Sequence, residues 1–254
     1  MSIVLKNINA GYKGFRLKEI SLKIETGSFT ALIGPNGCGK STLLKTIARI
    51  LPTAGGAVEI AGKNIKSERT KAVARKVAVL PQHPVVPPGI SVQQLVGYGR
   101  APHQNLLGFK TAKDHEMIEH ALKTVSLIDL RHKLVAELSG GQRQRAFVAM
   151  SIAQDTPYLL FDEPTSFLDI RYQYEVLDLL RDLNNKGRTC VVVLHDIAQA
   201  ARYATDLVVM KDGAIHSRGT PKTVITPQTV EQVYEIKARV YQDPVSNTAV
   251  VSPL

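Results

Sequence analysis

The chain is 254 residues long, with 44% hydrophobic and 21% charged residues and a formal net charge of +10. This length fits one large domain, or a core with an inserted subdomain, and the composition is ordinary for a globular protein. Its apolar runs, such as residues 190–194, fall far short of the roughly 20 residues of a membrane span, and the first residues lack a signal-peptide pattern. We therefore expect a cytosolic protein whose positive charge suits an acidic partner: a nucleotide, a nucleic acid or a membrane surface.

The N-terminal part of the chain predicts a small antiparallel sheet. Apolar and polar residues alternate over residues 3–9 and again over residues 17–24. The intervening residues 11–14 begin and end with glycine, which favours a turn between two half-buried strands.

A glycine-rich loop follows the apolar run 29–33 and precedes a helical segment at 42–51. This is the strand–loop–helix context that a phosphate-binding motif requires. The glycines let backbone N–H groups turn inward around an anion, and the helix that follows adds its positive end. Lys40 is expected to reach the β- and γ-phosphates of a nucleotide, and the Ser41 hydroxyl to bind Mg²⁺. We predict ATP and Mg²⁺ at this loop, with contacts from Gly34, Pro35, Asn36, Gly37, Cys38, Gly39, Lys40, Ser41 and Thr42.

Basic residues gather between strands predicted at 57–60 and 77–80, with Glu68 as their one acidic neighbour. The cluster is open to two interpretations. A nucleic-acid patch would need aromatic residues for base stacking, which the cluster lacks, so we favour a solvated face near anionic lipid. Its members are Lys63, Lys66, Arg69, Lys71, Arg75 and Lys76.

The middle of the chain predicts a linker followed by helices. Proline and glycine are frequent from residue 83 to about 108, which indicates a mobile linker region. An amphipathic helix is predicted over 114–125. A second helix begins after Ser139, where Gly140 and Gly141 can form another anion-binding nest.

The C-terminal half alternates strands with helices. Buried strands are predicted at 158–161 and 189–194, with an amphipathic helix at 171–184 between them and a hairpin with an Asp-Gly turn over 207–215. This alternation indicates a parallel α/β sheet. A short helix is expected at 228–234, within a tail that runs from 221 to 254.

Two carboxylates, Asp162 and Glu163, follow the strand predicted at 158–161. Asp162 can hold Mg²⁺ together with Ser41. Glu163 can polarise a water molecule aligned with the γ-phosphorus. The pair therefore indicates nucleotide hydrolysis rather than nucleotide binding alone.

In this order the motifs resemble one family, the ATP-binding subunits of ABC transporters, over essentially residues 2–220. The segment 138–142, Leu-Ser-Gly-Gly-Gln, is similar to the family's signature motif, and 158–163 to its Walker B strand. In the family the signature contacts nucleotide bound to the opposite subunit. The resemblance thus implies an ATP-dependent, head-to-tail homodimer.

The resemblance also implies roles for single residues. Gln82 is similar to the Q-loop glutamine, which would sense Mg²⁺ or the γ-phosphate, and His195 to the switch histidine. Tyr12 matches the aromatic residue that stacks on adenine, and Asp169 the D-loop aspartate. The implied catalytic residues are Glu163, His195 and Gln82; the Mg²⁺ ligands are Ser41, Gln82 and Asp162; further nucleotide contacts come from Tyr12, Asp162, Ser139, Gly140, Gly141, Gln142 and Asp169.

The fold that the resemblance implies is an α/β P-loop NTPase (RecA-like) in a single ATP-binding domain, residues 1–254. A parallel-sheet core would comprise residues 1–82 and 155–220 and carry an N-terminal antiparallel β subdomain. An α-helical subdomain would be inserted at about 83–154, and a C-terminal extension would occupy 221–254.

Longer segments, including 34–44, 96–103, 138–146 and 193–203, are similar to the bacterial iron–siderophore importer subfamily. That resemblance implies an ATPase on the cytoplasmic face of the inner membrane, peripheral to polytopic permease subunits, served indirectly by a substrate-binding protein and binding no nucleic acid. Three alternatives are a haem or cobalamin importer, an exporter, and a non-transport ABC ATPase acting on DNA or ribosomes.

Overall fold

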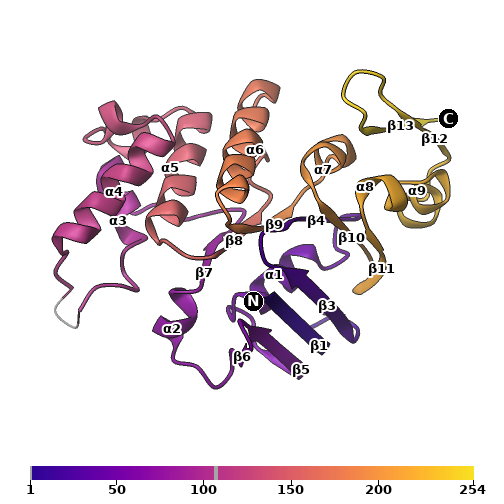
Figure 1. The fold of residues 1–254 in the computed structure, drawn as a ribbon, viewed down its shortest axis with the longest axis horizontal. Coiled ribbons are helices and arrows are strands. Elements are labelled where there is room, and N and C mark those ends of the chain that lie inside the picture. Colours follow the sequence, from indigo (N-terminus) through magenta and orange to yellow (C-terminus); the bar gives the residue numbers. More distant parts are fainter. Residues whose placement is uncertain (1, 106–107) are drawn as a thin grey trace.

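The computed structural model describes residues 2–105 and 108–254 and is built around a six-stranded sheet (Figure 1). Its strand order is β11-β10-β4-β9-β8-β7, and all neighbours pair in parallel except β10 and β11. Every residue of β4, β8 and β9 is buried, as continuous apolar strands in a parallel sheet require. The predicted parallel α/β sheet is therefore confirmed. The strands are β4 (Phe29–Ile33), β7 (Val77–Leu80), β8 (Tyr158–Asp162), β9 (Thr189–Val193), β10 (Asp206–Lys211) and β11 (Ala214–Gly219).

A second, antiparallel sheet lies below the first in Figure 1. Its central strand, β1, pairs with β3, as the alternation over residues 3–9 and 17–24 predicts, and on its other side with β5, a pairing that was not predicted. Buried and exposed residues alternate strictly along β3, so one face of this sheet packs on the core and the other meets solvent. The strands are β1 (Ser2–Tyr12), β2 (Phe15–Arg16), β3 (Ile20–Glu25), β5 (Thr53–Ile60) and β6 (Lys63–Asn64).

Three helices form a separate group at the left of Figure 1: α3 (Val92–Tyr98), α4 (Ala112–Thr124) and α5 (Gly140–Ala153). The short turns η1 (Ile128–Leu130) and η2 (Val135–Glu137) connect α4 to α5. The group falls within the range 83–154 expected for a helical subdomain.

The prediction of a mobile linker region from 83 to about 108 is wrong for residues 92–98, because they form α3. Ser91 and Gln94 form a reciprocal capping box at its start, and Val92, Leu95 and Val96 are buried on one face. Prolines and glycines thus mark the two ends of a short helix. Of the predicted linker, residues 106–107 lie outside the described residues.

The other helices that the structure describes lie in two parts of the chain, before β7 and after β8. The amphipathic helix predicted at 171–184 is present as α6 (Ile170–Asn185). It buries Val176, Leu177, Leu180 and Leu183, whereas Leu179, also expected to point inward, is half-buried against the core. The predicted short helix is present as α9. The full set is α1 (Lys40–Ile47), α2 (Thr70–Ala74), α6, α7 (Ile197–Tyr203), α8 (Pro221–Val224) and α9 (Pro227–Tyr234), and the chain ends in the hairpin β12 (Ala238–Gln242) and β13 (Ala249–Pro253).

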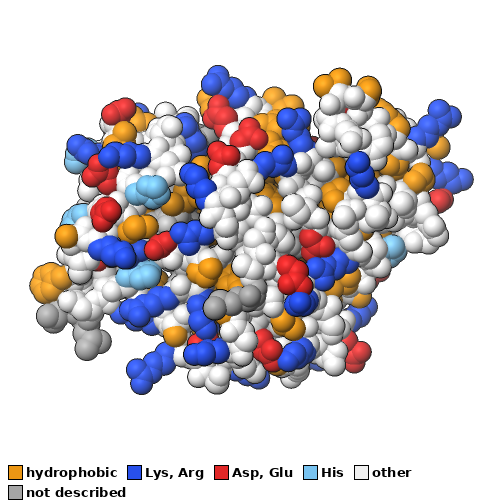
Figure 2. Space-filling view, viewed as in Figure 1, with side chains coloured by type: hydrophobic (Ala, Val, Ile, Leu, Met, Phe, Trp, Pro, Cys, Tyr) orange, Lys and Arg blue, Asp and Glu red, His pale blue; other side chains and the backbone are white. Residues whose placement is uncertain are grey.

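The predicted basic cluster surrounds α2, and Figure 2 shows Lys and Arg side chains gathered over that part of the face. Lys71 and Arg75 donate to backbone carbonyls of Gln104 and Pro102, and Lys76 pairs with Glu68 at 2.5 Å. Three of the six charges therefore have intramolecular partners. The choice between a nucleic-acid patch and a lipid-facing surface stays a prediction.

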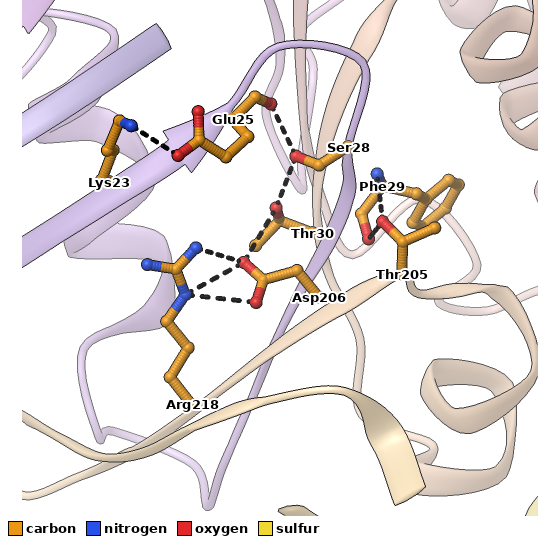
Figure 3. Close-up of polar contacts among 8 residues, drawn as sticks. All are labelled: Lys23, Glu25, Ser28, Phe29, Thr30, Thr205, Asp206 and Arg218. Carbon is orange, nitrogen blue, oxygen red and sulfur yellow. Dashed lines mark hydrogen bonds and ion pairs between the residues drawn. The ribbon is translucent and has the colours of Figure 1, made fainter. Parts of the chain in front are cut away.

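A polar network fixes the amino ends of β4 and β10 (Figure 3). Arg218 of β11 makes a bidentate pair with Asp206, whose carboxylate also accepts from the buried Thr30 hydroxyl at 3.5 Å. Beside it, the Thr205 hydroxyl accepts from the Phe29 N–H at 2.9 Å. These bonds hold the parallel register of the two strands at the end opposite the glycine-rich loop.

A buried ion pair joins the three helices of the separate group. Arg100, just after α3, contacts Asp114 of α4 at 2.8 Å and donates to the Ala153 carbonyl at the end of α5; both charged side chains are 3% exposed. Burial alone would raise the pKa of Asp114, but hydrogen bonds from Thr111 and Arg100 outweigh it and lower the pKa to about 2. Stabilisation by this carboxylate is therefore complete above an ordinary aspartate pKa of about 4 and is lost as the pH falls towards 2.

We expect Asp114→Ala to lower the free energy of unfolding by about 3–5 kcal/mol at neutral pH, because it leaves the Arg100 charge buried and unpaired. Urea denaturation measures this change. The matched control is Glu119→Ala, which breaks the exposed pair with Lys123 on the same helix and is expected to cost less than about 1 kcal/mol. An equal decrease in the free energy of unfolding in the two variants would contradict the conclusion that the buried pair matters more to stability than the exposed one.

Candidate nucleotide site

The glycine-rich loop joins the carboxyl end of β4 to the amino end of α1. Lys40 is 5% exposed, and its ammonium group donates to the carbonyls of Gly34 and Pro35 at 2.8 and 2.9 Å. The loop borders a pocket of about 290 Å³. The pocket is lined by Tyr12, Phe15, Asn36, Gly37, Gly39, Lys40, Ser41, Thr42 and Glu163.

Gly34 holds the loop against the strand behind it. A Cβ atom added to Gly34 would lie 2.1 Å from the Met210 carbonyl oxygen, so there is no room for a side chain. The φ of Gly34, +144°, is also one that residues with a side chain rarely adopt. Only glycine allows this close approach of two backbone segments. The predicted loop conformation therefore depends on a contact with β10 as well as on local glycines.

A hydroxyl and a carboxylate meet beside the pocket. Ser41 of α1 donates to Asp162 at the end of β8, with 2.8 Å between the oxygens. Asp162 is 2% exposed, and burial raises its pKa, while the Ser41 hydrogen bond opposes that shift. Both groups are hard oxygen donors of the kind that Mg²⁺ takes from proteins alongside phosphate oxygens. Ser41 and Asp162 therefore fit an Mg²⁺ ion that also binds phosphate. A metal site made by protein side chains alone is a different matter: the described residues contain no cluster of three or more His, Cys, Asp or Glu side chains that could hold one.

Glu163 is the meeting point of three neighbouring strand ends. Its carboxylate lies 2.5 Å from His195, which follows β9, and accepts a hydrogen bond from Gln82, which follows β7. The Ser166 hydroxyl donates to the same carboxylate at 3.0 Å. Glu163 itself has a φ of +54°, an uncommon value for a residue with a side chain. The structure thus brings together all three residues expected to be catalytic.

The expected adenine contact, Tyr12, is 52% exposed and lies at the rim of the pocket, where Phe15 is its neighbour. Phe15 was not among the residues expected at the site, although an aromatic residue three positions after Tyr12 was a usable signal. Nor was the contact of Ser166 with Glu163 expected, because it depends on the path of the chain after β8.

The expected signature residues occupy the start of α5. Ser139 caps this helix through a reciprocal capping box with Gln142. An ideal Cβ on Gly141 would lie 2.8 Å from the Tyr172 ring of α6, so close packing requires this glycine, whereas Gly140 is exposed. The signature residues do not line the phosphate pocket, and Figure 1 shows the start of α5 apart from α1.

Asp169 is exposed at the start of α6, and the adjacent Phe167 and Ile170 are 89% and 72% exposed. Such large apolar side chains at a polar edge favour contact with another surface. Asp169 itself is not among the residues that line the pocket of its own chain.

Comparison with known proteins identifies the class. The ABC transporter family pattern matches residues 17–166, and the chain belongs to this family. It is accordingly an ATP-binding and ATP-hydrolysing chain with the P-loop NTPase fold of ABC cassettes, as expected from its motifs.

Individual relatives are similar over almost the whole chain. The probable siderophore transport system ATP-binding protein YusV of Bacillus subtilis is 45% identical over 99% of this chain and 92% of its own length. The ferric enterobactin transport ATP-binding protein FepC of Escherichia coli is 42% identical over 98% of this chain and 93% of its own.

Solved structures agree with this family. A metal-chelate type ABC transporter, described in an inward-facing conformation, has a chain that aligns with a TM-score of 0.87 at 26% identity, over 100% of this chain and 97% of its own. The cassette MJ0796, in a dimeric post-hydrolysis state with ADP and Pi, aligns with a TM-score of 0.76 at 29% identity. The alignment covers 86% of this chain and 98% of that cassette. Within the described part of this chain, no helix has the length and apolar character needed to cross a membrane.

We expect Gly34→Ala to weaken ATP binding at least tenfold, because the new Cβ would displace the loop from Met210. Isothermal titration of the purified chain with ATP measures the affinity. Gly187→Ala is the matched control: Gly187 also has a positive φ, of 89°, but an added Cβ there meets nothing within 4 Å. Wild-type affinity in the Gly34 variant would refute the supporting role of this contact.

Proposed function

We propose that this chain is the ATP-hydrolysing subunit of a binding-protein-dependent ABC importer that energises uptake of an iron(III)-siderophore or related iron chelate. The observation that carries the ATPase chemistry is the convergence of Gln82, Glu163 and His195 beside the phosphate pocket. The cargo is supported by relatives whose names specify siderophore or ferric enterobactin transport and which align over nearly their full length.

In the proposed site, Lys40 leaves the carbonyls of Gly34 and Pro35 and pairs with the β- and γ-phosphates of ATP. The exchange is favourable because a phosphate is a stronger partner for an ammonium group than a neutral carbonyl. Ser41 and Asp162, with Gln82, would hold Mg²⁺, whose charge would stabilise the phosphate oxygens. Tyr12 stacks on the adenine at the rim of the pocket.

Glu163 acts as the general base and His195 as its orienting partner in this proposal. The carboxylate accepts a proton from the attacking water, which must lie in line with the γ-phosphorus. The contacts with His195, Gln82 and Ser166 fix the rotamer of the carboxylate before substrate arrives. Movement of Gln82 would transmit the nucleotide state to the segment that leads into the helical group.

The separation of the signature from the phosphate pocket supports a head-to-tail dimer. Each chain then presents Ser139, Gly140, Gly141 and Gln142 to the nucleotide of the other, together with Asp169. The N-terminus of α5 provides backbone N–H groups and a positive helix end for phosphate. The exposed Phe167 and Ile170 would be covered in the same contact.

The proposed assembly includes polytopic permease subunits and, indirectly, a substrate-binding protein, and involves no nucleic acid. The chain would bind the permease at the cytoplasmic face of the bacterial inner membrane as a peripheral subunit. Relatives described as import ATP-binding proteins support this arrangement.

We expect Glu163→Gln to reduce ATP hydrolysis by about 100-fold or more, because an amide cannot accept the proton. The variant should remain as an ATP-bound dimer, seen by light scattering as twice the 27.8 kDa mass of one chain. Adding Ser139→Arg should preserve ATP binding but restore the monomer mass. A monomer of Glu163→Gln at saturating ATP would contradict the proposed dimer.

The importer assignment is tested by capturing membrane partners. Tagged Glu163→Gln with ATP is incubated with detergent-solubilised native membranes, and bound proteins are identified by mass spectrometry; Lys40→Ala, which should not form the ATP-bound dimer, is the control. We expect a polytopic permease encoded beside an iron-chelate binding protein. A permease for haem or cobalamin would change the cargo, an exporter would reverse the direction, and ribosomal or DNA-repair partners without a membrane protein would refute transport.

A further inference from the structure

A pair of glutamines lies between α6 and α7, the helices that follow β8 and β9. The segment 165–168 leads into α6, and α7 begins two residues after His195. The two helices lie side by side (Figure 1), and Gln199 of α7 meets Gln173 of α6 between them. Gln199 is 3% exposed, and neither glutamine is among the residues that line the phosphate pocket.

The two glutamines belong to a chain of hydrogen bonds that begins and ends in the segment 165–168. The Thr165 hydroxyl donates to Gln199 Oε1 at 3.4 Å, and Gln199 Nε2 donates to Gln173 Oε1 at 2.5 Å. Gln173 Nε2 in turn donates to the Leu168 carbonyl at 2.9 Å. Because a carbonyl can only accept, Leu168 fixes which end of the Gln173 amide faces it, and Gln173 then fixes the amide of Gln199. The pair therefore holds the segment at its first and last residues.

The backbone on this side of the site needs such support. Glu163 and Phe167 have φ values of +54° and +62°, in the left-handed region that residues with side chains rarely adopt. The Phe167 side chain is 89% exposed, so it gains little from packing within its own chain. Uncommon backbone conformations persist only where surrounding contacts fix them. The hydrogen bonds of Gln199 and Gln173 supply contacts of this kind from two neighbouring helices.

The segment also contacts the proposed general base directly. The Ser166 hydroxyl donates to the Glu163 carboxylate at 3.0 Å, and the Ser166 N–H donates to the Glu163 carbonyl at 3.2 Å. Ser166 lies between the two residues that the glutamine pair holds, Thr165 and Leu168. A displacement of the segment therefore moves the Ser166 hydroxyl and, with it, the carboxylate of Glu163.

The packing of α6 against α7 has other contacts besides the glutamines. The Tyr203 hydroxyl of α7 donates to Asp178 of α6 at 2.6 Å, and the rings of Tyr203 and Tyr174 lie 6.3 Å apart. The Arg181 guanidinium lies 4.4 Å from the centre of the Tyr203 ring. Removing the glutamine amides should therefore disturb the segment while the two helices stay together.

We propose that Gln199 and Gln173 are positioning residues for ATP hydrolysis. By holding the segment 165–168 at both ends, they keep the Ser166 hydroxyl on the carboxylate of Glu163. The orientation of the general base then depends on α7 as well as on the strand that precedes it. This inference rests on the proposed function, because it requires Glu163 to be that base.

The test is Gln199→Met, which keeps the length of the side chain and removes its amide. In a steady-state assay of the intact chain, we expect kcat for ATP hydrolysis to fall about tenfold, because misplacing a reacting group by 1 Å can cost about a hundredfold. The KM and Kd for ATP should change less than about twofold, because Gln199 does not line the pocket. Gln173→Met should show the same separation of kcat from KM.

Gln154→Met is the matched control. Gln154, at the end of α5, also joins distant segments through its amide, which donates to the carbonyls of Ala74 and Val77 at 2.6 and 2.9 Å. Both this variant and Gln199→Met should unfold at lower urea concentrations than the wild-type chain. Only Gln199→Met should lose kcat, which distinguishes positioning of the base from a general loss of stability.

Ser166→Ala tests whether the effect passes through the segment. Gln199→Met should reduce kcat less in a Ser166→Ala background than in the wild-type chain, because the contact that it supports is already absent. Wild-type kcat in folded Gln199→Met and Gln173→Met would overturn the inference, and so would an equal loss of kcat in Gln154→Met. Hydrolysis that survives Glu163→Gln would instead refute the proposed function.

Discussion

The candidate site depends on one constraint: neighbouring parallel strands end at the same edge of the sheet. Burial on both faces fixes β4, β8 and β9 in register, so the residues that follow them must meet. Glu163, His195 and the phosphate loop are brought together in this way. The antiparallel sheet adds Tyr12 and Phe15 at the rim, and α1 adds Ser41.

The polar groups of the site satisfy one another. Lys40 uses carbonyls of its own loop, Ser41 uses Asp162, and Glu163 has three partners. Buried charges require such partners, so Lys40 can bind a phosphate only by giving up the carbonyls of Gly34 and Pro35. Nucleotide affinity is consequently a difference between two sets of contacts, and residues behind the loop can change it without touching the ligand.

Much of the site was predictable because its signals are local. Glycines at left-handed φ, a serine cap three residues before a glutamine, and continuous apolar strands each act within a few residues. The helix α3 was missed because prolines and glycines at its ends were given more weight than the capping box of Ser91. The hairpin at the C-terminus carried too weak an alternation to be expected.

By itself the sequence determined the phosphate loop, the strands and helices of the main sheet with strong apolar patterns, and the residue types needed for ATP hydrolysis, since short-range sterics and hydrogen bonding specify them. Only the tertiary structure decided which side chains meet. Gln82 and Glu163 are 81 residues apart in the chain, and their contact follows from strand order. The contact of Met210 with Gly34 likewise arises from packing between distant segments, which no local pattern encodes.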